Sequence, residues 1–473
     1  MTRAWLLAVS LLACGPRTSR PPTEGVVPWA RSGIDWRTPP AVDDVAWTAP
    51  VVAETLLDNG IRIVVVENHR LPLVAVRVLH TGAGSRMDGT EPGLASLTAD
   101  VLDEGAGDRS TSRVARELAR QGTQLEITIA TDHATQQLVT RTRELGPALA
   151  LVAEMIRRPS FEDADFVRAR SSKLTEVLAH RTQTRRIAAH VFDRLVFGAH
   201  PYAEPAEGTA RSIPALTLEA VRGFWARNYR PDAMTLVIAG DTTMAAVREL
   251  VHSKLGDWTA PAPPLPIPAT PPPYKAAVAY VDVPGARETN VIVGRRAGAL
   301  DDPQQLAGEV ANAIVGGGLD GRLDRELHTK LALTFGASSS FWRGVAAGSW
   351  AAAATFETMN TAAGIDALLG VLATARTSEP TAAEITSARR DLVAAARTSY
   401  DTTVGTARAV ERLVLQRQPL DSHATLAARL ATLTAAQIRD ALPLGDLAIV
   451  LVGDWTRFRD GLVELGVATP YQP

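Results

Sequence analysis

Two kinds of hydrophobic pattern alternate along the chain and predict groups of strands and helices. Short runs rich in valine, leucine and isoleucine predict strands at Ile61–Glu67 and Leu73–Leu79, which Asn68–Pro72 joins as a strand pair. Apolar residues recurring at helical spacing predict helices at Pro92–Leu102 and over the long stretch Asp163–Leu195. Because strands and helices come in groups with short links, the pattern predicts an α+β fold. Helices should pack on one face of a mostly antiparallel sheet.

The other predicted elements follow the same order in both halves of the chain. In the first half they are a helix at 112–120 closed by Gly122, paired strands at 125–131 and 134–140, and a helix at 145–157. In the second half they are strands at 278–283 and 290–295, a helix at 304–315, strands near 333–341 and 348–356, and helices at 361–374 and 381–414. The shared order indicates two repeats of one unit.

Short sequence motifs that recur in both halves support this duplication. In each half a short helical segment with a threonine cap precedes a buried strand that ends in Gly-Asp, and an Ala-Arg pair lies inside the long helical stretch. The matching words are Thr217–Arg222 with Thr434–Arg439, Met234–Asp241 with Leu447–Asp454, and Ala169-Arg170 with Ala388-Arg389. Several coincidences in one order, at offsets of about 213 to 219 residues, predict two homologous repeats.

A proline cluster divides the predicted repeats. Pro261–Pro273 is too rich in proline for a helix or a central strand. At 473 residues the chain also exceeds one ordinary core. The predicted organisation is a signal peptide (1–13), a lipidated N-terminus and flexible tether (14–50), an N-terminal α+β domain (51–258), a proline-rich linker (259–274) and a C-terminal α+β domain (275–473).

The first residues predict export. Arg3 precedes Ala4–Ala13, an apolar run of signal-peptide length, and the only cysteine, Cys14, follows directly. This resembles a bacterial lipobox, so we expect Cys14 to be lipidated. Gly15 rather than Asp at the next position suggests the periplasmic face of the outer membrane. A plain cleaved signal with an incidental cysteine is the alternative. No later run approaches the 18 apolar residues of a membrane span.

Charge and composition exclude one class of partner. The formal net charge is −2, with apolar and charged residues in ordinary globular proportions. The chain therefore has no excess of positive charge that would attract nucleic acid, and it has no acidic tail. Contact with a membrane is expected only through the lipid anchor.

Several short sequence motifs in both halves resemble those of a known family. They are Leu57–Gly60, Gly82–Ser85, Gly93–Ala95, His200–Tyr202, Asn228–Pro231, Gly316–Gly318 and Arg322-Leu323. Together with the element order they resemble the pitrilysin/insulinase family of zinc peptidases, whose signature is an inverted H-x-x-E-H helix. The resemblance implies a clam-like pair of α+β halves around a chamber. Extended peptides would bind there by adding to a sheet edge.

The positions that match the zinc motif no longer suit zinc chemistry. Where the family has its first histidine, its glutamate base and its second histidine, this chain has Ser96, Ala99 and Asp100. The third family ligand matches Glu176, which is retained as a vestigial candidate. Two carboxylates are fewer than the three protein ligands usual for catalytic zinc, and Ala99 cannot accept a proton. We therefore expect neither metal nor any other cofactor.

The second half carries further changes at the family's substrate positions. The family's arginine and tyrosine match His328 and Phe335, and Phe335 lacks the hydroxyl donor that oxyanion stabilisation needs. Gly316, Gly317 and Gly318 form either a helix stop or a mobile lip that touches peptide. These five residues remain the candidate substrate contacts.

Three hypotheses follow for function. The favoured one is a non-catalytic subunit that pairs with an active insulinase-type peptidase chain and helps to bind extended peptides. The second is a peptide-binding or holdase lipoprotein that acts alone. The third is a divergent metallopeptidase that uses Asp100 and Glu176. A weaker alternative is a site for a hard cation at Asp100, Asp103 and Glu104.

Overall fold

The computed structural model describes residues 47–473, apart from 261–262, 264, 267–268, 319, 466–468 and 472–473. The predicted signal segment and Cys14 lie outside the described residues, as does most of the predicted tether. The elements below all belong to one unit, Ala49–Pro473. Among the described residues, the helices are too short or too polar to cross a membrane.

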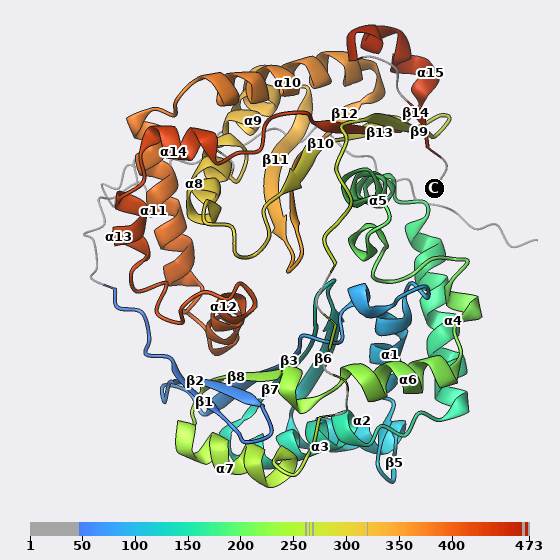
Figure 1. Ribbon diagram of the computed structural model, residues 1–473, viewed down its shortest axis with the longest axis vertical. Coiled ribbons are helices and arrows are strands. Elements are labelled where there is room, and N and C mark those ends of the chain that lie inside the picture. Colours follow the sequence, from blue (N-terminus) through green and yellow to red (C-terminus); the bar gives the residue numbers. More distant parts are fainter. Residues whose placement is uncertain are drawn as a thin grey trace, which may run out of the picture. The chain divides into compact units, whose positions relative to one another are not determined.

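The first half forms a mixed six-stranded sheet in the order β1-β2-β8-β3-β7-β6 (Figure 1). The strands are β1 Ala53–Leu56, β2 Arg62–Glu67, β3 Leu73–His80, β6 Gln124–Ile129, β7 Ala134–Arg141 and β8 Met234–Gly240. All neighbours are antiparallel except β2 and β8, which are parallel. β8 is buried along its whole length, which explains why its sequence is apolar apart from Thr235.

The second half repeats this topology in the order β11-β12-β10-β13-β9-β14. The strands are β9 Val278–Asp282, β10 Glu288–Ala297, β11 Thr334–Arg343, β12 Gly348–Glu357, β13 Ala448–Gly453 and β14 Thr469–Pro470. The series β2-β8-β3-β7-β6 thus matches β9-β13-β10-β12-β11, and β13 is parallel to β9 as β8 is to β2. The predicted α+β fold with two homologous repeats is confirmed.

The predicted pairing of the first two long strands is wrong. β2 and β3 are not neighbours, because β8 inserts between them and pairs with both. In the second half β13 separates β9 from β10 in the same way. A short link predicts a hairpin from local sequence, but the apolar strands β8 and β13 need a central place where both of their faces are covered.

Helices of each half share one core with the sheet of that half, some against the strands and others against neighbouring helices. In the first half they are α1 Leu94–Leu102, α2 Thr111–Gln121, α3 Leu145–Arg157, α4 Asp163–His180, α6 Leu218–Asn228 and α7 Met244–Leu255, with a small ribbon of β4 Gly105–Ala106 and β5 Arg109–Ser110. In the second half they are α8 Gln305–Val315, α9 Arg322–Asp324, α10 Thr361–Thr377, α11 Ala382–Thr398, α13 Leu426–Ala431, α14 Ala435–Asp440 and α15 Trp455–Phe458. The predicted helix ends are confirmed where Gly122 adopts a left-handed conformation and where Thr217 and Thr434 cap their helices.

Each of the two longest predicted helices is broken into two. The stretch 163–195 forms α4 and then α5 Thr184–Phe197, and the stretch 381–414 forms α11 and then α12 Thr403–Leu415. Thr402 begins α12 by accepting the backbone N–H of Gly405. Helical periodicity continues through both breaks, so the sequence pattern alone did not reveal them.

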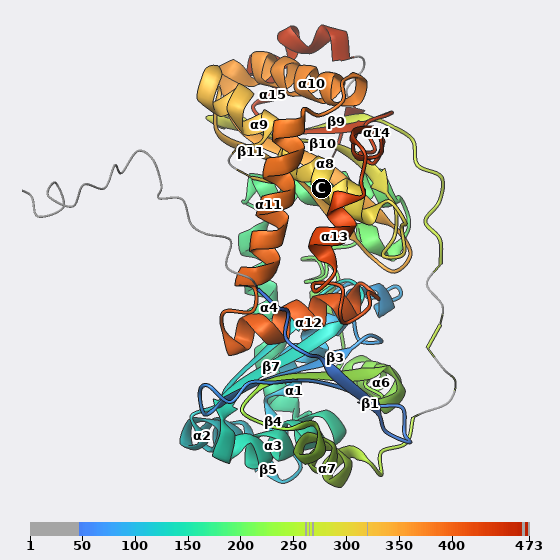
Figure 2. The same cartoon turned by 90° about the vertical axis from the view of Figure 1, so that its left-hand side faces the viewer.

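The breaks allow the two halves to exchange helices (Figures 1 and 2). Helix α5 packs on the second sheet, where Val191 and Phe192 join a buried cluster with Val450. Helix α12 packs on the first sheet, where Ala407 and Val410 join a cluster with strands β2, β3 and β8. Each sheet is therefore covered on its second face by one helix of the other half, which the prediction of helices on one face had missed.

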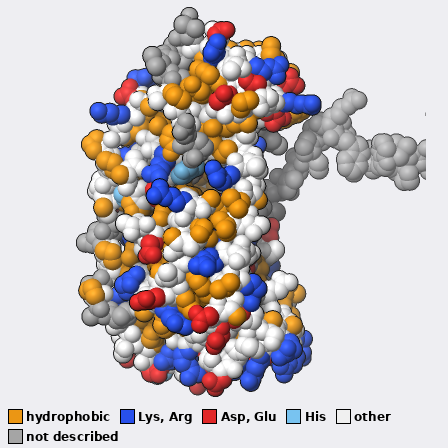
Figure 3. All heavy atoms as spheres, turned by 90° about the vertical axis from the view of Figure 1, so that its right-hand side faces the viewer, with side chains coloured by type: hydrophobic (Ala, Val, Ile, Leu, Met, Phe, Trp, Pro, Cys, Tyr) orange, Lys and Arg blue, Asp and Glu red, His pale blue; other side chains and the backbone are white. Residues whose placement is uncertain are grey.

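Figure 3 shows one face of the molecule with basic, acidic and apolar side chains intermingled. On this face no continuous basic patch stands out, in keeping with the formal net charge of −2.

Candidate functional site

Helix α1, which carries the degenerate motif, is fixed by its apolar side and by a cap at its start. The predicted stripe of Leu94, Leu97 and Val101 is buried in the core of the first half. The carboxylate of Asp88 accepts two backbone N–H groups at the start of the helix, each at 2.8 Å. Burial raises the pKa of Asp88 to about 7, and these hydrogen bonds partly oppose the shift. The position of the three motif residues is therefore well defined.

Lys173 of α4 lies between the two carboxylates that match metal-ligand positions. Its Nζ is 3.0 Å from Oδ2 of Asp100 and 3.1 Å from Oε2 of Glu176. The Lys173 side chain is 9 % exposed, whereas those of Asp100 and Glu176 are 37 % and 48 % exposed. Ser96 and Ala99 are buried on the same helix as Asp100. The structure thus brings Asp100 and Glu176 together around an ammonium group.

The charge of Lys173 is maintained by its partners. Burial by itself lowers the pKa of a lysine, but the charges and hydrogen bonds of Asp100 and Glu176 outweigh this effect, so that the pKa of Lys173 is raised. Lys173 is therefore a protonated cation at neutral pH and not a nucleophile or a base.

The candidate residues of the second half lie around β11. Phe335, near the start of this edge strand, is 94 % exposed. His328 lies in the π-helical segment Arg325–Lys330, and its Nδ1 is 3.3 Å from Oδ2 of Asp324. No hydrogen bond or ion pair between described residues joins this group to Asp100 or Glu176. The structure therefore places the candidate residues in two separate groups.

The three glycines lie at the end of α8. The N–H groups of Gly316 and Gly317 both donate to the carbonyl of Asn312, which ends the helix. The carbonyl of Gly316 accepts the N–H of Ser339 in β11 at 2.7 Å, and a Cβ on Gly316 would lie 2.8 Å from that nitrogen. This geometry favours a helix stop with a close approach of two backbones. The role of the glycines in binding peptide stays a prediction.

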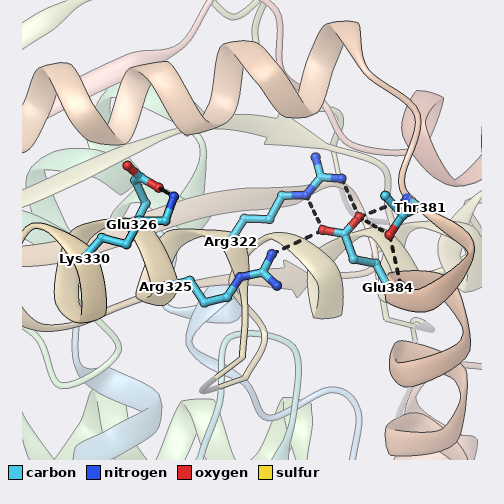
Figure 4. A network of polar contacts seen from close by, with 6 residues as sticks. All are labelled: Arg322, Arg325, Glu326, Lys330, Thr381 and Glu384. Atoms are coloured by element: carbon cyan, nitrogen blue, oxygen red, sulfur yellow. Dashed lines mark hydrogen bonds and ion pairs between the residues drawn. The ribbon is translucent and has the colours of Figure 1, made fainter.

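A network of charges ties this region to α11 (Figure 4). Both oxygens of Glu384 accept hydrogen bonds from Arg322, at 2.8 and 2.9 Å, and Arg325 donates at 3.3 Å. Glu384 also completes a capping box with Thr381 at the start of the helix. These interactions, led by the hydrogen bonds from Arg322, lower the pKa of Glu384 to about 2. The network fixes α9 against α11.

Comparison with known proteins identifies the scaffold. A family model described as Insulinase (Peptidase family M16) matches residues 62–209, and one described as Peptidase M16 inactive domain matches residues 215–392. Together they cover more than half of the chain. The chain belongs to the insulinase family, peptidase family M16.

Individual members of the insulinase family agree with this assignment. A protein of Mycobacterium leprae named as an uncharacterized zinc protease is 27% identical over 296 residues, which make up 61% of this chain and 65% of that protein, less than two thirds of its length. The non-peptidase homolog YmxG of Helicobacter pylori is 25% identical over 175 residues, 37% of this chain and 40% of that protein. The crystal structure of a peptidase M16 inactive domain from Pseudomonas fluorescens superimposes with a TM-score of 0.78 at 25% identity, covering 85% of this chain and 98% of that one. The relatives of this insulinase-like homologue thus include proteins named as zinc proteases and one named as a non-peptidase homolog.

The residues at the family's zinc position do not fit zinc. Asp100 and Glu176 supply only carboxylate oxygens, and both point at the ammonium of Lys173, whose positive charge opposes a second cation. Within the described residues, no group of three or more His, Cys, Asp or Glu is placed to hold a metal ion. Ala99 supplies no proton acceptor. We therefore derive no step through a metal at this position.

The alternative site for a hard cation is also not supported by this donor set. Glu104 turns to Arg168, with 2.6 Å between Oε2 and the guanidinium, and Asp100 turns to Lys173. Burial, together with the negative charge of Glu104, raises the pKa of Asp103 to about 6. Asp100 and Glu104 are thus paired with two different cations of the chain, and burial disfavours the charged form of Asp103.

Sequence reasoning missed Lys173, although two signals pointed to it. Lys173 precedes Glu176 by three positions, so both side chains lie on one face of a helix. In addition, only four of the 49 Lys and Arg residues are lysines, so a lysine at this position is an unusual choice for this chain. A compact ammonium, rather than the wide fork of an arginine, suits a point between two carboxylates.

Proposed function

We propose that this insulinase-family chain is a non-catalytic subunit that pairs with an active zinc peptidase chain of the same family and helps it to bind extended peptides. The observation that carries the proposal is the Lys173 ammonium between Asp100 and Glu176 on a complete two-repeat scaffold. A peptidase fold without catalytic residues can still form part of the wall of a peptide-binding chamber and contact the substrate. Without an imidazole pair and a glutamate base, the chain alone is expected not to hydrolyse peptides.

An open sheet edge supports the peptide-binding part of the proposal. Strand β6 pairs with β7 on one side, and no other described strand pairs with its outer edge. Its residues alternate between exposed and half-buried, and α1 contacts the strand. An extended peptide can add to such an edge by hydrogen bonding to the backbone.

Co-expression tests the pairing. The chain is produced with an insulinase-type chain that has an intact H-x-x-E-H motif, ideally the product of a neighbouring reading frame. We expect the two to co-purify, and peptide cleavage by the active chain to rise when this chain is present. Recovery of this chain only as a separate species, with cleavage unchanged by its addition, contradicts the pairing.

Backbone-methylated peptides test the addition to β6. An N-methyl group on residues whose N–H faces the strand removes the hydrogen bonds of the new ladder and should weaken binding, because strand addition depends on backbone groups. Methylation of the intervening residues, whose N–H groups face away, is the matched control. Equal binding of both peptides contradicts strand addition at this edge.

A stand-alone peptide-binding or holdase lipoprotein is the second candidate, favoured by the same open edge, which needs no partner chain. Titration of the isolated chain with an unfolded polypeptide distinguishes the two. Saturable binding together with suppressed aggregation, and no effect on any active peptidase chain, supports this second function.

A divergent peptidase predicts stoichiometric zinc in the purified chain and cleavage that a chelator abolishes.

Export and anchoring belong to the proposal as well. We expect the chain to be lipidated at Cys14 and held on the periplasmic face of the outer membrane. Replacement Cys14→Ser should move the chain from the membrane fraction to the soluble periplasmic fraction. An unchanged distribution contradicts lipidation at this residue.

A further inference from the structure

A cavity between the two halves has a strongly basic wall. Its volume is about 970 Å³, and residues of both sheets and of α12 line it. Seven arginines line the cavity against three carboxylates, Asp132, Glu309 and Glu411. The cavity is therefore basic in a chain whose formal net charge is −2, so its charge is a local feature.

Three of the arginines are neutralised by these carboxylates. The pairs are Arg77 with Glu411, Arg86 with Asp132 at 3.0 Å, and Arg343 with Glu309 at 3.0 Å. A fourth arginine, Arg62, pairs with Glu54 on the neighbouring strand. These pairs build a fixed wall, in which the Arg77–Glu411 pair joins β3 to α12.

The other three arginines form no ion pair with a described carboxylate, although the charge of Arg412 acts on Glu309 and lowers its pKa against the larger, opposite effect of burial. The Nε of Arg408 donates to the neutral amide oxygen of Gln137 at 3.2 Å. Arg412 and Arg417 form no ion pair and no side-chain hydrogen bond with another described residue. All three are exposed in the cavity wall. Guanidinium groups that line a cavity and form no ion pair are suited to bind a carboxylate or phosphate.

The spacing of these arginines fits a peptide better than a single small anion. Arg408 and Arg412 are four residues apart on α12, so they lie on one face about 6 Å apart along the helix axis. Alternate side chains of an extended peptide are separated by about 6.6 Å. Trp342 and Phe341 add an aromatic wall against which the stem of a side chain can pack.

We propose that this cavity binds an acidic stretch of an extended peptide, with two of its carboxylates paired to Arg408 and Arg412. The inference rests on the proposed peptide-binding function and names the class of peptide, one rich in Asp or Glu at alternate positions. Because the arginines are exposed, binding depends on electrostatic attraction and weakens with salt.

Fluorescence anisotropy with the full chain tests the inference. The probe is a labelled short peptide of alternating Glu and Ala, and its neutral counterpart has Gln for Glu. We expect the acidic peptide to bind more tightly, and added salt to reduce the difference. Double replacement Arg408→Gln and Arg412→Gln should weaken binding by about tenfold or more, because hydrogen bonds to charged groups are lost. The matched control is Arg116→Gln with Arg120→Gln, an exposed pair at the same spacing on α2, and it should leave binding unchanged.

The outcomes separate the inference from the proposed function. Equal binding of the acidic and the neutral peptide, or a double α12 variant that folds and binds as before, overturns the inference while peptide binding itself survives. Binding of inorganic phosphate or free glutamate as tight as that of the acidic peptide assigns the cavity to a small anion and also overturns it. If peptides of neither kind bind and cleavage by an active partner chain does not change, the proposed function fails together with it.

Discussion

In the first half of the chain one cation holds two carboxylates, and in the second half one carboxylate is held by two cations. Lys173 ties α4 to α1 through Asp100 and also pairs with Glu176 on its own helix. Glu384 ties α11, the matching helix of the second repeat, to Arg322 and Arg325. Both clusters join the long helix of their half to a neighbouring helical segment, with opposite signs of charge.

The positions of the second repeat that correspond to Lys173 and Glu176 carry no charge. When Ala169-Arg170 is placed on Ala388-Arg389, the positions of Lys173 and Glu176 correspond to Leu392 and Ala395. Leu392 packs against the apolar core of the second half. An apolar residue therefore suffices at the corresponding place of the second repeat, so the architecture of the repeat does not itself require these charges.

Restoring a zinc site is the change with the largest expected effect. The variant combines Ser96→His, Ala99→Glu, Asp100→His and Lys173→Ala, which leaves two imidazoles one helical turn apart and Glu176 as the third ligand. We expect metal analysis after dialysis to find zinc at one equivalent per chain. The same three changes on α1 with Lys173 retained are the control and should bind zinc more weakly, because the ammonium repels the ion. A folded quadruple variant without zinc contradicts the assignment of these positions.

Replacement Lys173→Leu brings the first half closer to the second and should be destabilising. Two carboxylates lose their cation and repel each other, and breaking a buried pair costs about 3–5 kcal/mol. Because Asp100 and Glu176 are partly exposed, we expect a loss of about 2 kcal/mol in the free energy of unfolding, measured by urea denaturation. The added changes Asp100→Ala and Glu176→Ala should recover most of this loss. If Lys173→Leu alone leaves the free energy of unfolding unchanged, the cluster contributes no stability.

The cluster of the second half predicts a dependence on acid. The pKa of Glu384 is about 2 in the folded chain, below the value of about 4.3 for an unperturbed glutamate. Its contribution is therefore present above about pH 4 and is lost as the pH falls through about 2. We expect Glu384→Gln to remove about 1 kcal/mol at neutral pH, since water screens the half-exposed Arg325. In acid the difference from the natural chain should shrink. A difference that stays constant from neutral pH into acid contradicts this origin.

The smallest effect is expected beside this network, at the exposed pair of Lys330 and Glu326 (Figure 4). The two groups are four residues apart in sequence and 2.6 Å apart in space. Exposed pairs of this kind contribute about 0.3–0.5 kcal/mol. Replacement Lys330→Ala should change the free energy of unfolding by no more than about 0.5 kcal/mol. A larger loss would show that the pair belongs to the Glu384 network.

The sequence by itself determined the two repeats, the α+β class, most helix and strand positions and the loss of the zinc motif. Each of these depends on residues close together in the chain: the strand runs that end in Gly-Asp, the threonine caps at Thr217 and Thr434, and Ser96, Ala99 and Asp100 on one helix. Local pattern determines such features because hydrophobic periodicity and capping act within a few residues.

Only the tertiary structure decided how distant segments meet. It placed β8 between β2 and β3, sent α5 and α12 to the sheets of the opposite halves, and set the ammonium of Lys173 between Asp100 and Glu176. These outcomes depend on which apolar faces can be buried together and on which charges then come within contact distance. The spacing of neighbouring residues does not determine which faces are buried together or which charges meet, because burial is a property of the whole assembled core.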